Sequence, residues 1–179
     1  MSAAAEQPLP VFAPQALRHA LGQFATGVTV VTAEQADGGL LGMTVSSFNT
    51  LSLDPPLILF SLGRHSTSGV ALEAVGRYAV NILSREQASL SNQFARPGGD
   101  KWSGVGWRRG GYGAPLLAGA LASFECQTHR LYDGGDHIIL VGRVMAFHLD
   151  PGAMPPLIFF RGGYHYLEGE GSGRHEAKG

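Results

Sequence analysis

The sequence predicts a mainly β protein, a closed or nearly closed antiparallel barrel with only two or three helices. Most apolar segments are short and rich in branched and aromatic side chains, which is typical of β-strands. Glycine accounts for 26 of the 179 residues, and glycine-containing turns separate many of these segments. Many short strands joined by such turns favour a barrel over a sheet covered by helices.

One domain is expected to span residues 14–167. Residues 1–13 are small, polar and proline-bearing, which predicts a flexible N-terminal arm, and residues 168–179 are expected to form a disordered tail. A helix is predicted to begin at Pro14, because proline is tolerated in the first helical turn. Apolar residues then recur at helical spacing and form one stripe: Leu17, Ala20, Leu21 and Phe24.

A hairpin and a hydroxyl-rich segment follow this helix. Thr26-Gly27 is expected to end the helix, and residues 28–33 and 40–46 are predicted strands around a glycine-containing turn. Small polar side chains then accumulate at Thr44, Ser46, Ser47, Asn49, Thr50 and Ser52. Hydroxyls without neighbouring acids or bases suit the binding of a polar ligand better than proton chemistry. An ordinary Ser/Thr-rich strand edge is the alternative.

The rest of the chain is expected to complete the sheet. Asp54-Pro55-Pro56 is predicted to form a turn, because each proline fixes its own φ and restricts the residue before it. Strands are predicted over residues 57–62, 78–83, 120–131, 137–149, 157–160 and 164–167. Helices are predicted after a Ser/Thr N-cap within residues 63–68 and over residues 86–94. Residues 96–115 contain seven glycines and are predicted to be a long surface loop, while the two longest strands should frame the sheet.

Composition excludes several kinds of partner and location. A net charge of −1 without a basic stripe argues against nucleic acid as the main partner. The apolar runs are too short to span a bilayer and the N-terminus lacks the pattern of a signal peptide. Cys126 is the only cysteine, which excludes an internal disulfide and indicates the reducing cytoplasm. Only 15% of residues are charged, so a partner subunit is expected to cover some apolar faces.

Several reaction classes lack their sequence patterns. Gly104-Val105-Gly106 follows no predicted strand and has its next glycine at position 110, so it fails the dinucleotide fingerprint. No Walker lysine loop and no Gly-x-Ser-x-Gly elbow is present, and no two of the seven histidines have zinc-helix spacing. No metal site is therefore predicted. The absence of a nucleophile or an acid–base pair fits an enzyme whose cofactor carries the chemistry.

Three separated motifs together resemble the short-chain flavin reductases, the small reductase components of two-component flavin monooxygenases. They are residues 24–32 around Thr26-Gly27, the hydroxyl-rich segment, and Gly135-Asp136-His137, and the resemblance extends from about Leu17 to Leu167. Members of this family adopt a Greek-key-like, antiparallel split β-barrel that binds FMN and forms a homodimer. The resemblance therefore implies the same fold and assembly, in agreement with the barrel expected from the strands.

The resemblance also implies an activity, that of an NAD(P)H:flavin oxidoreductase. NADH or NADPH would reduce FMN or FAD, and the reduced flavin would serve a partner monooxygenase. Two alternatives stay open. The chain could be a related flavin-dependent reductase of another acceptor, such as a corrinoid or ferric iron, or a flavin-binding protein without turnover.

Family motifs place the flavin on the hydroxyl-rich segment and on the loop before the predicted second helix. A helix start after a Ser/Thr-rich loop offers clustered donors for a phosphate. Phe94 either packs on the flavin or belongs to the core. The expected flavin-binding residues are Thr29, Met43, Thr44, Val45, Ser46, Ser47, Asn49, Ser61, Leu62, His65, Ser66, Thr67 and Phe94.

The Gly135-Asp136-His137 motif is linked in the family to the nicotinamide nucleotide, so His137 and Asp136 are the expected catalytic residues. A plain hairpin turn is the alternative. The expected nucleotide-binding residues are Thr26, Gly27, Asp136, His137, Arg161 and Tyr164. His165-Tyr166 stands where relatives often carry a basic residue, which leaves open the choice between NADH and NADPH. Asp100-Lys101-Trp102 resembles another family element, to which no role is assigned.

Overall fold

The computed structural model describes residues 11–152 and 154–167, so most of the predicted N-terminal arm and all of the predicted tail lie outside the described residues. Helices in the described part are α1 (Pro14–Leu21), α2 (Thr67–Val75), a 3-10 turn η1 (Arg85–Gln87) and α3 (Ala88–Ala95). Among these helices, none is both long enough and apolar enough to cross a membrane.

Twelve strands occur in the described residues, and every pair is antiparallel, which confirms the predicted mainly β class. The first six are β1 (Thr26–Gly27), β2 (Thr29–Glu34), β3 (Leu40–Val45), β4 (Asn49–Leu53), β5 (Pro56–Gly63) and β6 (Arg77–Ile82). The last six are β7 (Trp107–Arg109), β8 (Pro115–Leu117), β9 (Ala122–Gly134), β10 (His137–Leu149), β11 (Leu157–Phe160) and β12 (Gly163–Tyr166).

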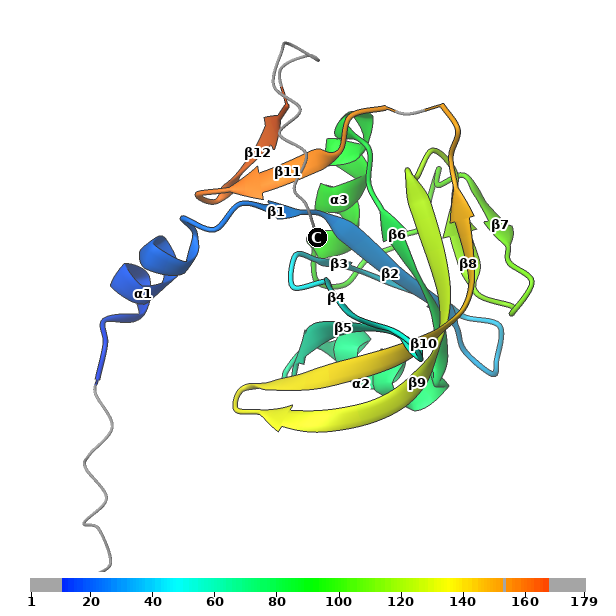
Figure 1. Ribbon diagram of the computed structural model, residues 1–179, viewed down its shortest axis with the longest axis horizontal. Helices are drawn as coiled ribbons and strands as arrows, with labels where there is room; N and C mark the ends of the chain where they lie inside the picture. The colour runs from blue at the N-terminus through cyan, green and yellow to red at the C-terminus, as the bar shows by residue number, and fades with distance from the viewer. Residues whose placement is uncertain (1–10, 153, 168–179) are drawn as a thin grey trace, which may run out of the picture.

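Seven of these strands form one large curved sheet in the order β3-β2-β6-β9-β10-β5-β4 (Figure 1). Its two edges, β3 and β4, follow one another in the chain but are not paired with each other, so hydrogen bonds do not close the sheet at this seam. A three-stranded sheet, β1-β11-β12, and the β7-β8 hairpin lie beside it.

The β9–β10 hairpin frames the large sheet, as the sequence predicted. The two strands have 13 residues each and are joined by the two-residue loop Gly135-Asp136. Gly135 has a φ of +77°, a conformation that costs glycine no side-chain clash. Strand β9 continues the sheet through β6, and β10 continues it through β5, so the hairpin joins the two halves.

Two apolar clusters lie against this sheet. In the larger one, Leu72 of α2 packs with strand residues such as Phe60 and Tyr78, whose rings meet edge to face with centroids 5.5 Å apart. Tyr78 packs so closely on β10 that a Cβ added at Gly142 would lie 2.0 Å from its hydroxyl, so only glycine fits there. In the second cluster, Phe94 of α3 packs with buried residues of β2 and β11. The two helices therefore cover different parts of the sheet.

Three boundary predictions need correction. Helix α1 ends at Leu21, and Thr26-Gly27 is not a helix end but the short strand β1, paired with β11. Asn49–Leu53, read from composition only as part of a polar segment, is the edge strand β4. The predicted loop 96–115 contains β7, which pairs with β8 through a turn that includes Gly113 at a φ of +91°. Such short strands carry too few alternations to be distinguished from loops.

A buried carboxylate holds this β7–β8 hairpin to the sheet. Glu125 of β9 is fully buried, and it accepts hydrogen bonds from the amides of Gly111 (3.1 Å) and Tyr112 (2.7 Å). His148 Nε2 lies 3.0 Å from the same carboxylate. Burial raises the pKa of Glu125, but the bonds from His148 and the two amides outweigh burial and hold the pKa below the usual glutamate value.

Glu125→Gln should destabilise the protein by about 1–3 kcal/mol at neutral pH, because the amide nitrogen of glutamine would face backbone N–H donors. The lowered folded-state pKa means that the carboxylate stabilises the fold above about pH 4.3 and loses this effect as the pH falls through the folded value. The difference in unfolding free energy between the wild-type protein and Glu125→Gln should therefore become smaller in acid. Urea titrations at several pH values would measure it, with the exposed Glu86→Gln as control; a pH-independent gap would contradict the assignment.

Candidate functional site

A cavity of about 190 Å³ lies where β3, the first turn of α2 and the segment after α3 meet. Its lining residues are Met43, Thr44, His65, Ser66, Thr67, Ser68, Phe94, Ala95, Arg96, Pro97, Gly98 and Lys101. Six of the predicted flavin-binding residues gather here: Met43, Thr44, His65, Ser66, Thr67 and Phe94. Segments that are distant in the sequence thus form one concave site.

The start of α2 supplies hydrogen-bond donors to this cavity. Ser66 is the N-cap residue, with extended backbone angles, and its hydroxyl accepts from the amide of Gly69 at 3.2 Å. The remaining amides of a first helical turn have no partner within the helix and carry a partial positive charge. Together with the hydroxyls of Thr67 and Ser68, this end of the helix suits an anionic group.

Lys101 adds a cation to the same wall. Its ammonium group donates to the carbonyl oxygens of Phe94 (3.2 Å) and Gly42 (3.4 Å) and to the hydroxyl of Ser68 (3.4 Å). Burial lowers the pKa of Lys101. Sequence reasoning did not assign Lys101 or Arg96 to the site, although the Asp100-Lys101-Trp102 element had been noticed. Only the fold brings this element to the start of α2.

Several predicted flavin-binding residues lie in the core instead of on the cavity surface. Thr29 is buried and its hydroxyl donates to the carbonyl of Val45 at 2.9 Å. Val45 and Leu62 are buried as well, so only their backbone could reach a ligand. The Phe94 ring is fully buried and sits directly on Gly42, where a Cβ would lie 2.2 Å from it. Phe94 therefore belongs to the core, although it also lies in the wall of the cavity.

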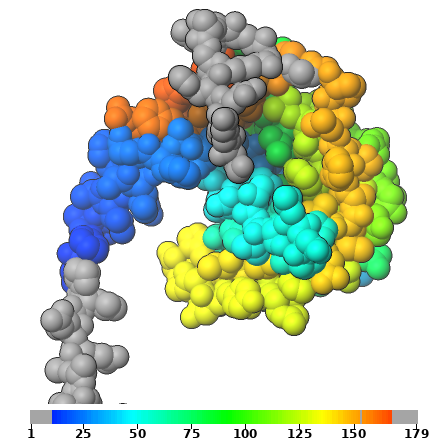
Figure 2. All heavy atoms as spheres, in the orientation of Figure 1, coloured from blue at the N-terminus to red at the C-terminus, as the bar shows by residue number. Residues whose placement is uncertain are grey.

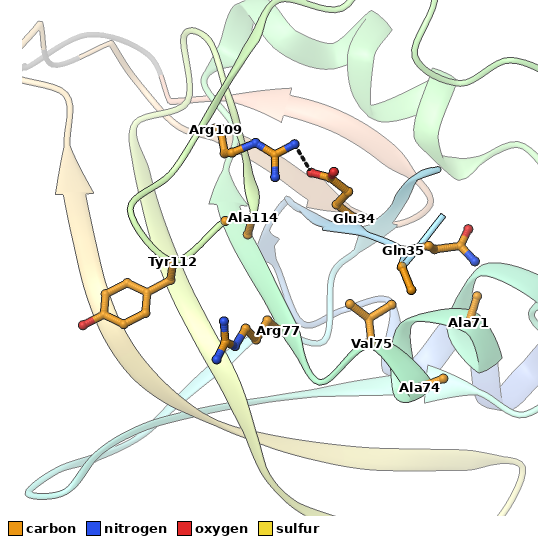
Figure 3. A pocket seen from close by; sticks show the side chains of 11 residues that line it. Glu34, Gln35, Ala71, Ala74, Val75, Arg77, Arg109, Tyr112 and Ala114 are labelled. Atoms are coloured by element: carbon orange, nitrogen blue, oxygen red, sulfur yellow. Dashed lines mark ion pairs between the residues drawn. The ribbon is translucent and has the colours of Figure 1, made fainter. Parts of the chain in front are cut away.

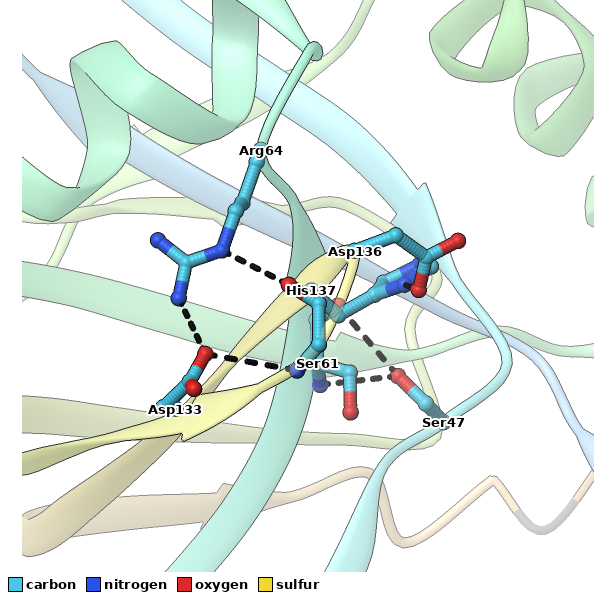
Figure 4. A network of polar contacts seen from close by, with 7 residues as sticks. Ser47, Ser61, Arg64, Asp133, Asp136 and His137 are labelled. Atoms are coloured by element: carbon cyan, nitrogen blue, oxygen red, sulfur yellow. Dashed lines mark hydrogen bonds and ion pairs between the residues drawn. The ribbon is translucent and has the colours of Figure 1, made fainter. Parts of the chain in front are cut away.

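Ser47 lies in the connection between the two edge strands, β3 and β4, and contacts β5. Its hydroxyl oxygen accepts from the amide of Ser61 at 2.9 Å (Figure 4). Ser46 and Asn49 are exposed on the two sides of this contact. The predicted residues of the hydroxyl-rich segment thus form the edge of the large sheet, with their backbone next to the cavity residues Met43 and Thr44.

Asp136 and His137 lie at the turn of the β9–β10 hairpin, close to the loop between β5 and α2. His137 Nδ1 is 2.7 Å from Asp136 Oδ1, and this hydrogen bond holds the pKa of Asp136 below its usual value. The charge of His65 adds a smaller effect in the same direction. A Cβ added at Gly63 would lie 3.8 Å from His137 Nε2 and 4.0 Å from Ser66 Cβ. The imidazole therefore lies beside the residues that lead into α2.

The other predicted nucleotide-binding residues lie on the small sheet or at its β11–β12 turn, and the side chains of Arg161 and Tyr164 have protein partners, whereas the buried hydroxyl of Thr26 has none among the described residues. Arg161, at a φ of +51°, donates from Nε to Gln23 Oε1 at 2.7 Å and connects the β11–β12 turn to the end of α1. Tyr164 donates its hydroxyl to Ser91 Oγ of α3 at 2.8 Å. Thr26 and Gly27 form β1 of the same sheet. These contacts support a structural role, and a role in nucleotide binding stays a prediction.

A larger cavity, of about 590 Å³, contains none of the predicted residues. It lies between the end of β2, the second half of α2 and the β7–β8 turn (Figure 3). Arg109 pairs with Glu34 at 2.5 Å at one end, while alanines and Val75 line much of the rest. Within the described part of the chain, no group of three or more His, Cys, Asp or Glu side chains is placed to hold a metal ion. The larger cavity also offers donors, from Gln35, Arg77 and Tyr112, so the predicted residues and the start of α2 are what distinguish the smaller cavity.

Comparisons with known proteins agree with this reading. The chain is 46% identical over 154 residues to a probable flavin reductase of Rhizobium meliloti, covering 86% of this chain and only 49% of that protein. It is 40% identical over 158 residues to the reductase subunit of a flavin-dependent monooxygenase of Mycobacterium tuberculosis, covering 88% of this chain and 84% of the relative.

A solved structure has the same fold. It is the NADH:FAD oxidoreductase of Streptomyces globisporus in complex with NAD and FAD fragments, which superposes with a TM-score of 0.84 at 36% identity. The match covers 92% of this chain and all of that one. The sequence model of the flavin reductase like domain matches residues 21–168. The chain therefore belongs to the flavin reductase like domain family.

Proposed function

We propose that this protein is an NAD(P)H:flavin oxidoreductase that reduces FMN or FAD and supplies the reduced flavin to a partner monooxygenase. The observation that carries the proposal is the cavity at the start of α2, with Lys101 in its wall and the His137 turn beside it. The relatives support it, because one is a monooxygenase reductase subunit and another was solved with NAD and FAD fragments. The single, buried thiol of Cys126 is consistent with action in the cytoplasm.

The residues of the cavity fit a flavin phosphate. The amides and hydroxyls at the start of α2 can donate to phosphate oxygens, and Lys101 can balance their charge. Met43 and Thr44, which also line the cavity, are placed to present backbone groups to the ring, followed by Ser46 and Ser47 at the seam. When bound, the flavin supplies the ring that accepts the hydride.

The protein's own contribution is then mainly to position two ligands. His137 Nδ1 donates a hydrogen bond to the Asp136 carboxylate, which fixes the imidazole and leaves Nε2 to contact the nicotinamide nucleotide. His137 lies beside the loop that begins the flavin cavity, so the two ligands would meet between this loop and the turn. Holding two reactants in contact accounts for a large part of many enzymatic rate enhancements.

NADH or NADPH oxidation by the purified protein should require added FMN or FAD. Lys101→Met should raise the KM for FMN about 10- to 150-fold, because one charge-assisted contact to the phosphate is lost. The KM for riboflavin should change little, because riboflavin has no phosphate. Steady-state kinetics with the three flavins would measure these effects, and a thermal midpoint would confirm that the variant is folded.

Other results would select the alternatives. Tight flavin binding without NAD(P)H oxidation would indicate a flavin-binding protein that does not turn over. Oxidation that depends on a corrinoid or on ferric iron, with flavin only as a bound group, would indicate a reductase of another acceptor. An equal rise of KM for FMN and riboflavin in Lys101→Met would contradict the assignment of the phosphate site.

His137→Ala should lower kcat/KM for NADH about 5- to 150-fold, as expected for the loss of one hydrogen bond or stacking contact. The dissociation constant of the flavin should not change. Asp136→Asn should have a smaller effect if the carboxylate only orients the imidazole. NADH kinetics and flavin titration on the same preparation would test this. Unchanged NADH kinetics in folded His137→Ala protein would remove the motif from the active site.

We further propose that the protein is a homodimer, because several large apolar side chains are exposed. Phe24 beyond α1 is 78% exposed, Leu53 of β4 is 97% exposed and Phe147 of β10 is 70% exposed. No residue of α1 is buried, and the helix projects from the sheet instead of packing on it (Figure 1). Figure 2 shows an open notch between α1 and the β9–β10 hairpin, which a second copy would fill.

Replacing Leu21 and Phe24 together with glutamate should shift the protein from dimer to monomer, because two charges would have to be buried in the interface. Sedimentation equilibrium at micromolar concentration would measure the shift. Tyr112→Glu introduces a charge at an exposed aromatic residue of the β7–β8 turn and is the control. A wild-type monomer that is fully active would contradict the proposal.

A further inference from the structure

Arg64 connects the two parts of the proposed site. It lies between β5 and α2, two residues before the N-cap Ser66. From this position its Nε donates to the carbonyl of Gly135 at 2.9 Å, and its Nη2 donates to Asp133 Oδ1 at 2.5 Å (Figure 4). Its backbone amide also donates to the carbonyl of Asp136 at 3.0 Å. Arg64, in the loop between β5 and α2, therefore binds three residues of the β9–β10 turn.

Few other strand-pairing contacts connect the β9–β10 turn to the rest of the large sheet. Strand β9 pairs with β6 only over Ala122–Gln127, so beyond Gln127 its only paired neighbour is β10. The pairing of β10 with β5 ends at His137, opposite Gly63. Two adjacent glycines, Gly134 and Gly135, precede Asp136, and glycine has the greatest backbone freedom of any residue. The side chain of Arg64 thus adds two hydrogen bonds to a turn whose strand pairing to the rest of the sheet ends at His137.

The geometry of the contact suits a restraint of this kind. An arginine guanidinium is planar and binds two acceptors in a fixed arrangement, which lysine cannot reproduce. Asp133 also accepts from the amide of Gly135 at 3.3 Å, so both acceptors of Arg64 belong to one small hydrogen-bonded unit. The hydrogen bond from Arg64 holds the pKa of Asp133 below its usual value.

We propose that Arg64 is a positioning residue: it holds the Asp133–Asp136 turn against the loop that leads into α2, and so sets His137 at a fixed place beside the flavin phosphate cavity. This inference rests on the proposed function, because it assumes that His137 contacts the nicotinamide nucleotide. Arg64 itself need touch neither ligand. Its two side-chain bonds point to the turn, and Ser66 and Thr67, not Arg64, line the cavity.

Exposed ion pairs contribute little to global stability, so removal of this side chain should leave the protein folded. The backbone bond from residue 64 to Asp136 persists in any variant. Arg64→Ala should therefore raise the KM for NADH about 5- to 50-fold, within the range for small displacements of reacting groups. The dissociation constant of FMN and the thermal midpoint should stay close to the wild-type values.

The matched variants separate the two-point contact from charge alone. Arg64→Lys keeps the charge, and it should restore NADH kinetics only in part because it cannot bind both acceptors. Arg64→Ala should have little further effect when added to Asp133→Ala, because the two residues act through one contact. Arg108→Ala removes an equally charged, exposed residue from β7. It should leave the KM for NADH, the dissociation constant of FMN, the thermal midpoint and hydrogen exchange unchanged. Hydrogen exchange at the amides of residues 133–137 should accelerate in Arg64→Ala and in Asp133→Ala, and not in Arg108→Ala.

The possible failures can be told apart. A wild-type protein that oxidises no NADH with any flavin would overturn the proposed function, and the positioning role with it. An active wild type with unchanged NADH kinetics in Arg64→Ala would overturn the positioning role alone. A parallel rise in the FMN dissociation constant would also overturn it, since Arg64 would then act on the flavin site. Full recovery in Arg64→Lys would overturn the two-point restraint.

Discussion

The hydrogen-bonded pairing of β9 with β10 is the interaction on which the rest of the structure depends. Each strand also pairs with one half of the large sheet, β9 with β6 and β10 with β5. Because side chains alternate along a strand, a shift of one residue in this pairing would turn the core faces outward. Close contacts such as that of Tyr78 with Gly142 permit one register only. The same register brings His137 opposite Gly63, at the end of β5.

The site follows from that register. Strand β5 ends where the loop to α2 begins, so the hairpin turn and the first turn of the helix meet at one edge of the sheet. Helix α2 is held in place by Leu72, which is buried in the larger core cluster. Behind the cavity, Phe94 packs on Gly42 and places the segment with Lys101 next to the helix. Core packing therefore brings backbone amides, hydroxyls and the cationic side chains of Arg96 and Lys101 to the same small cavity.

Part of the exposed apolar surface lies away from this packing, on α1, β4 and β10, where a second subunit is proposed. The two long strands thus serve two purposes. The segments near the turn carry His137, whereas the exposed Phe147 lies opposite Phe124, toward the other end of the hairpin. Catalysis by a bound flavin requires only such positioning and exclusion of water.

Local sequence patterns by themselves determined the strand segments, the turn glycines and the antiparallel class, because alternation and turn chemistry act between neighbours in the chain. They also pointed to a Ser/Thr N-cap, which is Ser66, whereas Gly135-Asp136-His137 was assigned through the family resemblance. Local patterns did not predict short strands such as β4 and β7, because whether three to five residues form a strand depends on pairing with a partner strand. Tertiary structure alone decided that Thr29 and Phe94 belong to the core and that Lys101 joins the cavity. It also decided that Arg64 reaches Asp133, 69 residues away. Such contacts depend on strand register and packing, which no local pattern specifies.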